Sequence, residues 1–159
     1  MKQQWKTAIK LVAGATVLSA SALALAQQAP KPENLIKWRQ SAFQLIAWNT
    51  GRIKANVEGS YNKDEVVRSA NTLAALSKSG VETLFVPGTE QGKGWHDTAA
   101  RAEVFSNNKH FLELAQNFST EATNFANLAA TGDQAAVKAE YSKLTKTCKA
   151  CHDDFKSKD

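Results

Sequence analysis

The sequence predicts an all-α fold, and within that class an antiparallel four-helix bundle. Apolar residues recur at three- and four-residue steps over most of the chain, and no stretch shows the strict alternation typical of a half-buried strand. Short connections and one longer loop separate four such periodic segments. Because short connections bring consecutive helices side by side in opposite directions, the bundle is the expected architecture.

The first two helices are expected on either side of a short Gly-Ser break. The first is predicted from about Pro32 to Val57, since proline is tolerated in a first helical turn and apolar positions follow at helical spacing. Asn62 and Glu65 are spaced like a capping pair and predict the start of the second helix. Gly80 is expected to close it.

A loop and two more helices complete the predicted bundle. The glycine-rich stretch from Val86 to Gly94 indicates the loop, and a long third helix is expected from about Thr98 to Thr131. Gly132 and Asp133 look like a C-cap followed by an N-cap. The apolar face of the last helix includes both cysteines, which predicts that they face the core: Val137, Tyr141, Leu144, Cys148, Cys151 and Phe155.

The only two cysteines of the chain lie in the motif Cys148-Lys149-Ala150-Cys151-His152. Cys-x-x-Cys-His is the signature of covalent c-type haem attachment. Two thiols about one helical turn apart can each form a thioether with a haem vinyl group, and the adjacent imidazole can then ligate the iron. The sequence therefore predicts one covalent haem c in the core of the bundle.

Three other interpretations of this motif are weaker. A thioredoxin-like pair is expected after a strand at the start of a helix, whereas this motif lies near the end of a helical segment. A structural zinc site usually needs four protein ligands, and the motif offers three. A disulfide would close a small, strained loop and would leave His152 unexplained.

Residues 1–26 have the layout of a secretory signal peptide, and residues 27–159 form the predicted mature domain. Three lysines precede a short apolar run that ends in an Ala-x-Ala cleavage site, and the run is too short and too rich in small residues for a membrane anchor. Removing three of the 20 basic residues leaves 17 against 15 acidic ones, a net charge of +2. This charge and the lack of a basic stripe argue against nucleic-acid binding. The expected destination is the periplasm of a Gram-negative cell.

Taken together, these features resemble the cytochrome c′ family, the class II c-type cytochromes. Five stretches carry the resemblance besides the haem motif: 31–33 (Lys-Pro-Glu), 37–42 (Lys-Trp-Arg-Gln-Ser-Ala), 51–52 (Gly-Arg), 85–90 (Phe-Val-Pro-Gly-Thr-Glu) and 100–106 (Ala-Arg-Ala-Glu-Val-Phe-Ser). The family is a four-helix bundle with its haem motif near the C-terminus. The resemblance implies that Cys148 and Cys151 bind haem covalently and that His152 is the proximal iron ligand.

The resemblance also assigns roles to residues outside the motif. Arg39 and Gln40 match haem-contacting positions, the arginine pairing with a propionate, although a solvated helix face explains both at least as well. Phe43 matches a residue over the distal side of the iron, and core packing is the alternative. Lys156 matches a basic position on the proximal side and otherwise suggests a surface lysine. The loop Gln91–Thr98 departs from the family by its greater length.

The expected function depends on the sixth coordination position of the iron. Met1 is the only methionine and leaves with the signal peptide, so a methionine ligand is excluded, and neither His96 nor His110 is expected to ligate iron. Five-coordinate iron with an apolar distal pocket favours NO and CO over O₂. We expect a gas-binding cytochrome rather than an enzyme, with a role in NO scavenging or protection from nitrosative stress and with possible one-electron transfer. The alternatives are a dedicated electron carrier and, with His96 as acid/base, a weak peroxidase.

The resemblance implies a homodimer formed through the first two helices. Trp38 and Trp48 are ten residues apart and cannot both lie on one apolar face of a helix. Trp48, or its neighbour Gly51, is therefore expected to contribute to an exposed apolar patch. The sequence does not identify a redox partner, and no membrane association is expected after signal cleavage.

Overall fold

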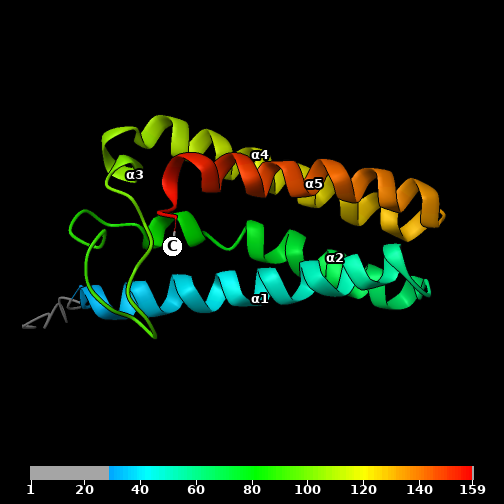
Figure 1. Cartoon of the computed structure of the whole chain (residues 1–159), viewed down its shortest axis with the longest axis horizontal. Coiled ribbons are helices and arrows are strands. Elements are labelled where there is room, and N and C mark those ends of the chain that lie inside the picture. The colour runs from blue at the N-terminus through cyan, green and yellow to red at the C-terminus, as the bar shows by residue number, and fades with distance from the viewer. Residues whose placement is uncertain (1–28, 159) are drawn as a thin grey trace, which may run out of the picture.

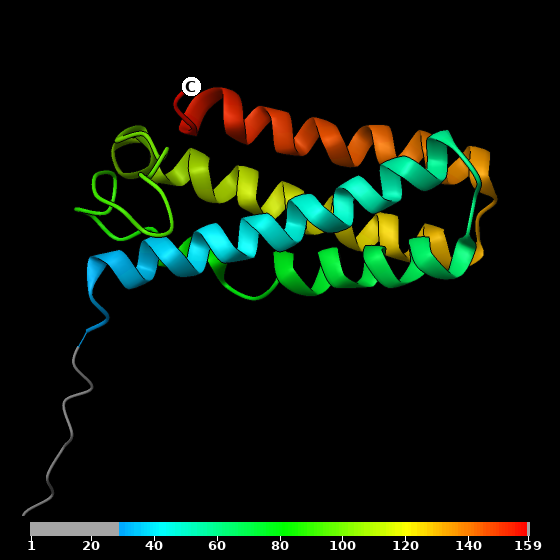
Figure 2. The same ribbon diagram turned by 60° about the horizontal axis from the view of Figure 1, so that its bottom comes forward.

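The computed structural model describes residues 29–158, which form a bundle of four long helices (Figure 1). Consecutive long helices run in opposite directions, so the start of α1, the connection between α2 and α4, and the end of α5 lie at one end of the bundle (Figure 2). The predicted all-α, antiparallel four-helix fold is confirmed. The long helices are α1 (Pro32–Glu58), α2 (Lys63–Ser77), α4 (Asn108–Thr131) and α5 (Gln134–Phe155), and the short ones are η1 (Val81–Leu84) and α3 (Glu103–Ser106).

Local signals fix three of the helix starts as predicted. Pro32 is the first residue of α1. The side chain of Asn62 accepts a hydrogen bond from the backbone N–H of Glu65 at 3.1 Å, and that of Asp133 accepts one from Ala136 N at 2.8 Å. Each cap satisfies a backbone donor that the first helical turn leaves without a partner. At its other end, α2 stops three residues before Gly80, whose φ of +80° suits glycine.

The predicted start of the third helix at Thr98 is wrong. Residues 98–102 are not helical, and the long helix α4 begins only at Asn108, after the single turn α3. The backbone N–H of Arg101 donates to the carbonyl of Phe155 at 2.9 Å, and Ala100 forms an isolated antiparallel bridge with Lys156. Pairing with the end of α5 therefore outweighs the helical preference of this alanine-rich stretch.

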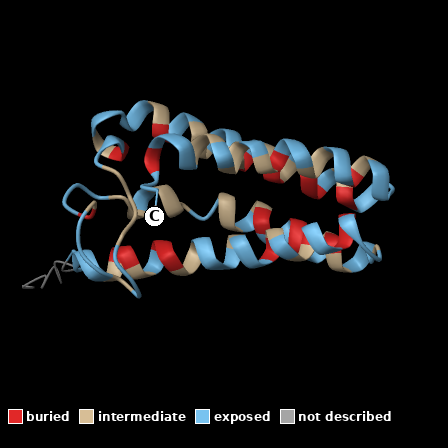
Figure 3. Ribbon diagram, viewed as in Figure 1, coloured by how far each residue is buried: buried red, intermediate tan, exposed pale blue. Residues whose placement is uncertain are grey.

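Two apolar clusters hold the bundle together, and most buried residues lie on the inner faces of the helices (Figure 3). The larger cluster joins all four long helices; its fully buried members include Ile53, Leu73, Phe125 and Leu144. Burying each such side chain contributes about 1.5–3 kcal/mol. The smaller cluster consists of Val104, Phe111 and Phe155, and packs against Phe85, Phe105, Leu114 and Cys151.

The expected signal peptide, residues 1–26, lies outside the described residues and stays a prediction. The same holds for the first two residues and the last residue of the expected mature domain, 27–159. Within residues 29–158, no helix combines the length and the apolar character needed to cross a bilayer.

Candidate haem-binding site

The two cysteines lie one turn apart on α5, with both thiols free and partly buried. The Cys148 thiol donates a hydrogen bond to the carbonyl of Leu144 at 3.7 Å, within its own helix. Cys151 packs against the smaller apolar cluster. The predicted orientation toward the core is confirmed for Cys151, and Cys148 is partly buried one turn before it.

The acidity of the thiols argues against one of the alternative interpretations, the reactive redox pair. Burial raises the pKa of Cys148, and burial together with the charges of Cys148 and Asp154 raises the pKa of Cys151 to about 11. A reactive redox pair instead needs a thiol whose pKa is lowered. Among residues 29–158, no group of three His, Cys, Asp or Glu side chains is arranged to hold a metal ion.

His152 lies in the last turn of α5, and its backbone carbonyl accepts a hydrogen bond from Lys156 N at 3.2 Å. His152 is exposed in terms of accessible surface, yet desolvation by the atoms around its ring lowers the pKa of the imidazole; the nearby positive charge of Lys156 lowers it further, and Asp153 partly opposes the shift. The neutral imidazole, which is the form that binds iron, is therefore favoured. Lys156 is exposed and directly follows the last residue of α5, and its predicted place on the proximal side of the haem stays a prediction.

A row of aromatic rings connects α1 to the cysteine motif. Phe43 and Phe85 lie edge-on with ring centroids 6.3 Å apart, Phe85 and Phe111 are 4.9 Å apart, and Phe111 and Phe155 are 5.4 Å apart. Phe43 is 43% exposed although it belongs to this row. The exposed Phe43, the half-buried Phe85 and the half-buried thiols are apolar groups of the kind that contact a porphyrin, whereas Phe111 and Phe155 are buried.

Arg39 is buried next to this aromatic row, with only 2% of its surface exposed. Its guanidinium lies over the ring of Phe85 at 4.5 Å and donates to Thr89 Oγ1 at 2.7 Å, to the carbonyl of Thr89, and to Thr98 Oγ1 at 2.6 Å. Burial lowers the pKa of Arg39, and the charge of Glu90 partly offsets this. The alternative of a solvated helix face is therefore wrong for Arg39, and its pairing with a haem propionate stays a prediction.

Gln40 is 8% exposed and holds the loop Gln91–Thr98 against α1. Its side-chain carbonyl accepts a hydrogen bond from Trp95 N at 2.7 Å, and its amide donates to the carbonyl of His96 at 2.9 Å. The solvated-face alternative is wrong here too. These bonds show that Gln40 anchors the loop, while its predicted contact with haem stays untested.

The loop forms a small hairpin on the surface of α1, closed by an isolated bridge between Lys93 and Asp97. At its tip, the Trp95 indole donates to Ser41 Oγ at 2.9 Å, and Lys37 Nζ lies 5.4 Å from the centre of the ring. The imidazole Nδ1 of His96 lies 2.8 Å from the carbonyl oxygen of Asp97. The extra length of this loop is therefore used to cover the first turns of α1.

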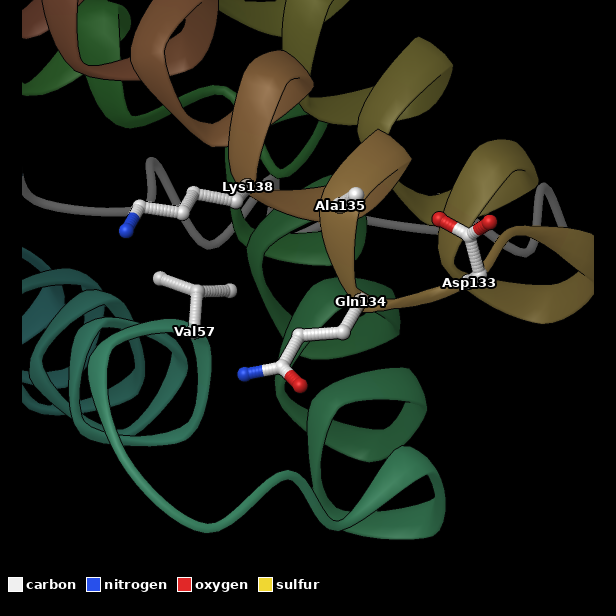
Figure 4. A pocket seen from close by; sticks show the side chains of 5 residues that line it. All are labelled: Val57, Asp133, Gln134, Ala135 and Lys138. Atoms are coloured by element: carbon white, nitrogen blue, oxygen red, sulfur yellow. The ribbon is translucent and has the colours of Figure 1, made fainter.

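Sequence reasoning missed the partners of Arg39. Thr89 and Thr98 are 50 and 59 residues away from it and lie in a loop without periodicity, so no local signal indicated their role. The chain has a further surface hollow of about 460 Å³ at the start of α5 (Figure 4). The cysteine motif lies in the second half of that helix. The hollow is lined by Val57, Asp133, Gln134, Ala135 and Lys138.

Fold and site together define a class of protein. A four-helix bundle that presents a Cys-x-x-Cys-His motif from its last helix, beside an apolar aromatic wall and a buried arginine, is a c-type haem protein of the bundle type.

Comparison with known proteins agrees with this class. A family model described as cytochrome c′ matches residues 34–156. The cytochrome c′ of Rhodocyclus tenuis is 53% identical over 130 residues, which cover 81% of this chain and 98% of that protein. The chain belongs to the cytochrome c′ family, and it binds covalent haem c as the proteins of this family do.

Two solved structures extend the comparison. One is a cytochrome c′ described as having an unusual ligand-controlled dimer dissociation; it is 37% identical, with a TM-score of 0.77, over 81% of this chain and 98% of that one. The other is a nitric oxide complex of a variant of the cytochrome c prime from Alcaligenes xylosoxidans, 31% identical, with a TM-score of 0.71, over 81% of this chain and 98% of that one.

Proposed function

We propose that this protein is an exported, periplasmic haem protein that reversibly binds NO and CO at a five-coordinate iron and is not an enzyme. When bound, the haem would supply an iron that can take a small diatomic ligand. The protein supplies the covalent attachment, a neutral imidazole on one side, and an apolar surface on the other.

One observation carries the proposal: both histidines that could compete for the open position are engaged elsewhere. His96 contacts the backbone of its own hairpin, and His110 Nε2 lies 3.1 Å from Asp154 Oδ2. The sole methionine, Met1, belongs to the expected signal peptide. On the distal side, α1 instead presents Phe43, next to Phe85.

The chemistry of the distal side favours NO and CO over O₂. Bound O₂ carries a partial negative charge and gains most from a hydrogen-bond donor, whereas NO and CO depend less on one. The rings of Phe43 and Phe85 offer no such donor, and Arg39 donates to Thr89 and Thr98 instead. The nitric oxide complex of the Alcaligenes xylosoxidans relative supports NO as a ligand. We infer a role in NO scavenging or in protection from nitrosative stress.

The two other functions are less well supported. A dedicated electron carrier usually fills both axial positions of its iron, in the common case with His and Met, and the expected mature domain contains no methionine. Occasional one-electron transfer stays compatible with the site. A peroxidase needs a distal acid or base. His96 is the candidate, and it lies in a hairpin anchored to α1 by Gln40, with its Nδ1 beside the carbonyl of Asp97.

We also propose that the protein forms a homodimer through α1 and α2. Trp38 and Trp48 on α1 are 49% and 59% exposed, and Leu45, which lies between them in the sequence, is exposed as well, as expected for an apolar surface around Trp48. Such a row of large apolar side chains is suited to a second copy of the same helix. The similar cytochrome c′ described as having a ligand-controlled dimer dissociation supports a dimer as such.

Titration of the reduced holoprotein with CO and NO tests the proposed function. The wild-type protein should bind both gases at one site per chain, with a shift of the haem absorption band. The Phe43→Ala variant should bind CO at least about tenfold faster, a lowering of the barrier by about 1.4 kcal/mol, because the ring no longer screens the iron. A wild-type protein whose spectrum does not respond to either gas would contradict the proposal.

A further inference from the structure

Residues 98–101, here called the strap, connect the two sides of the haem site. At its first residue, Thr98 Oγ1 accepts a hydrogen bond from the buried guanidinium of Arg39, on α1, at 2.6 Å. At its other end, Arg101 N donates to the carbonyl of Phe155 at 2.9 Å. The strap therefore runs from the distal helix α1 to the end of the proximal helix α5.

The strap forms backbone hydrogen bonds with Phe155, the last residue of α5, and with Ser157, two residues beyond it. Besides the bond to Phe155, the backbone N–H of Ser157 donates to the carbonyl of Ala99 at 2.8 Å, and its hydroxyl donates to the same carbonyl at 3.2 Å. Phe155 and Ser157 follow His152 by three and five positions. The last turn of a helix frays easily, so these hydrogen bonds hold the last turn of α5 in place.

A single hydroxyl oxygen joins the two halves of this connection. Thr98 Oγ1 accepts from Arg39 and also from the backbone N–H of Ala100, at 3.2 Å. Ala100 is the residue that forms the bridge with Lys156. A displacement of Arg39 is thus passed to the segment that pairs with the end of α5 through one atom of Thr98.

We propose that Thr98 is a positioning residue for His152: through the strap it fixes the last turn of α5, and with it the imidazole, relative to Arg39 and the distal side of the site. This inference rests on the proposed function, because it concerns how a gas bound on one side affects the protein ligand on the other. His152 would hold the iron of a bound haem, and its retention when a gas is bound would depend on how firmly the end of α5 is held.

The test compares Thr98→Val with two control variants, all as holoprotein. Thr98→Val keeps the shape of the side chain and removes the accepting oxygen, Thr98→Ser keeps that oxygen, and Thr120→Val makes the same change at an exposed position of α4. Two quantities are measured: amide hydrogen exchange at Arg101 and Ser157 in the gas-free protein, and the fraction of the reduced NO complex that retains its histidine ligand, by electron paramagnetic resonance.

Thr98→Val should exchange both amides about tenfold faster or more, since a charge-assisted hydrogen bond is lost, and should retain the histidine ligand in a smaller fraction of molecules. Thr98→Ser and Thr120→Val should match the wild type in both quantities. Unchanged exchange and unchanged histidine retention in Thr98→Val would overturn the inference.

A second variant covers the case in which Thr98→Val does not fold or does not acquire haem. Ser157→Pro removes the backbone donor to Ala99, leaves Arg39 and Thr98 intact, and follows Lys156, whose extended backbone (φ −111°, ψ 132°) suits a residue before proline. It should accelerate exchange at Arg101 and lower histidine retention; no change in either would overturn the inference. Failure of the wild type to bind NO would refute the proposed function alone, because the exchange measurement needs no gas.

Discussion

Gly94 gives the sharpest test of how the hairpin is held against α1. A Cβ atom added at Gly94 would lie within 3.0 Å of Gln40 Oε1, 2.8 Å from Lys37 N and 2.9 Å from Ile36 Cγ2. Gln40 cannot simply rotate away, because its Oε1 also accepts the hydrogen bond from Trp95 N at 2.7 Å. The Gly94→Ala variant must therefore lift the hairpin from α1.

The expected cost follows from two contributions. Forcing an extra methyl into a close-packed contact costs about 1–3 kcal/mol. Separating Trp95 N from Gln40 removes a hydrogen bond that contributes about 1 kcal/mol. We expect Gly94→Ala to lower the free energy of unfolding by about 2–4 kcal/mol, which for a domain of this size lowers Tm by roughly 6–16 °C.

Thermal unfolding of the holoprotein, followed by circular dichroism, measures this effect. Gly51→Ala is the matched control, because a Cβ at Gly51, within α1, meets nothing within 4 Å. Alanine is the better helix former, so this variant should be more stable than the wild type by about 0.5–1 kcal/mol. The same chemical change is thus expected to have opposite signs at the two glycines. Equal Tm values for the two variants would refute the close approach of the hairpin to α1.

Two further predictions concern helix α5 and the pairing of α1 with α2. Asp133→Ala should lower the free energy of unfolding by about 1 kcal/mol through loss of the cap on Ala136 N, and Asp133→Ser should restore most of it; denaturation in urea measures both. Arg52 Nε donates to Glu65 at 2.8 Å and lowers the pKa of that carboxyl. The ion pair of Arg52 and Glu65 therefore stabilises the fold fully above about pH 4.5, and this stabilisation is lost as the pH falls below that value. Glu65→Gln should remove this part of the pH dependence; a Tm that falls as steeply with acid in the variant as in the wild type would contradict the pairing.

The sequence predicted those parts of the fold that depend on near neighbours along the chain. The first residue of α1 and the caps at Asn62 and Asp133 follow from residue types within one helical turn, and they are where they were expected. The orientation of Cys151 follows from the periodicity of α5 in the same way. The cysteine motif was recognisable because the chemistry of haem attachment requires one fixed spacing.

The parts that the sequence did not predict depend on contacts between distant residues. The burial of Arg39 and Gln40 results from a hairpin that lies about 50 residues further along the chain, and their charged or polar character suggested solvent instead. The late start of α4 has a similar cause, because Ala100 pairs with the end of α5. No pattern in the neighbouring sequence indicates that Arg39 and Gln40 bind the loop, or that residues 98–101 form the strap.

The absorption spectrum of the reduced protein, recorded with and without CO, tests the central claim most directly. We expect a covalently bound haem that stays with the chain on denaturation, the broad bands of high-spin five-coordinate iron without gas, and a full shift on adding CO. A reduced protein with the sharp bands of six-coordinate low-spin iron and no response to CO would show that a second side chain fills the position beside Phe43, and would contradict the account.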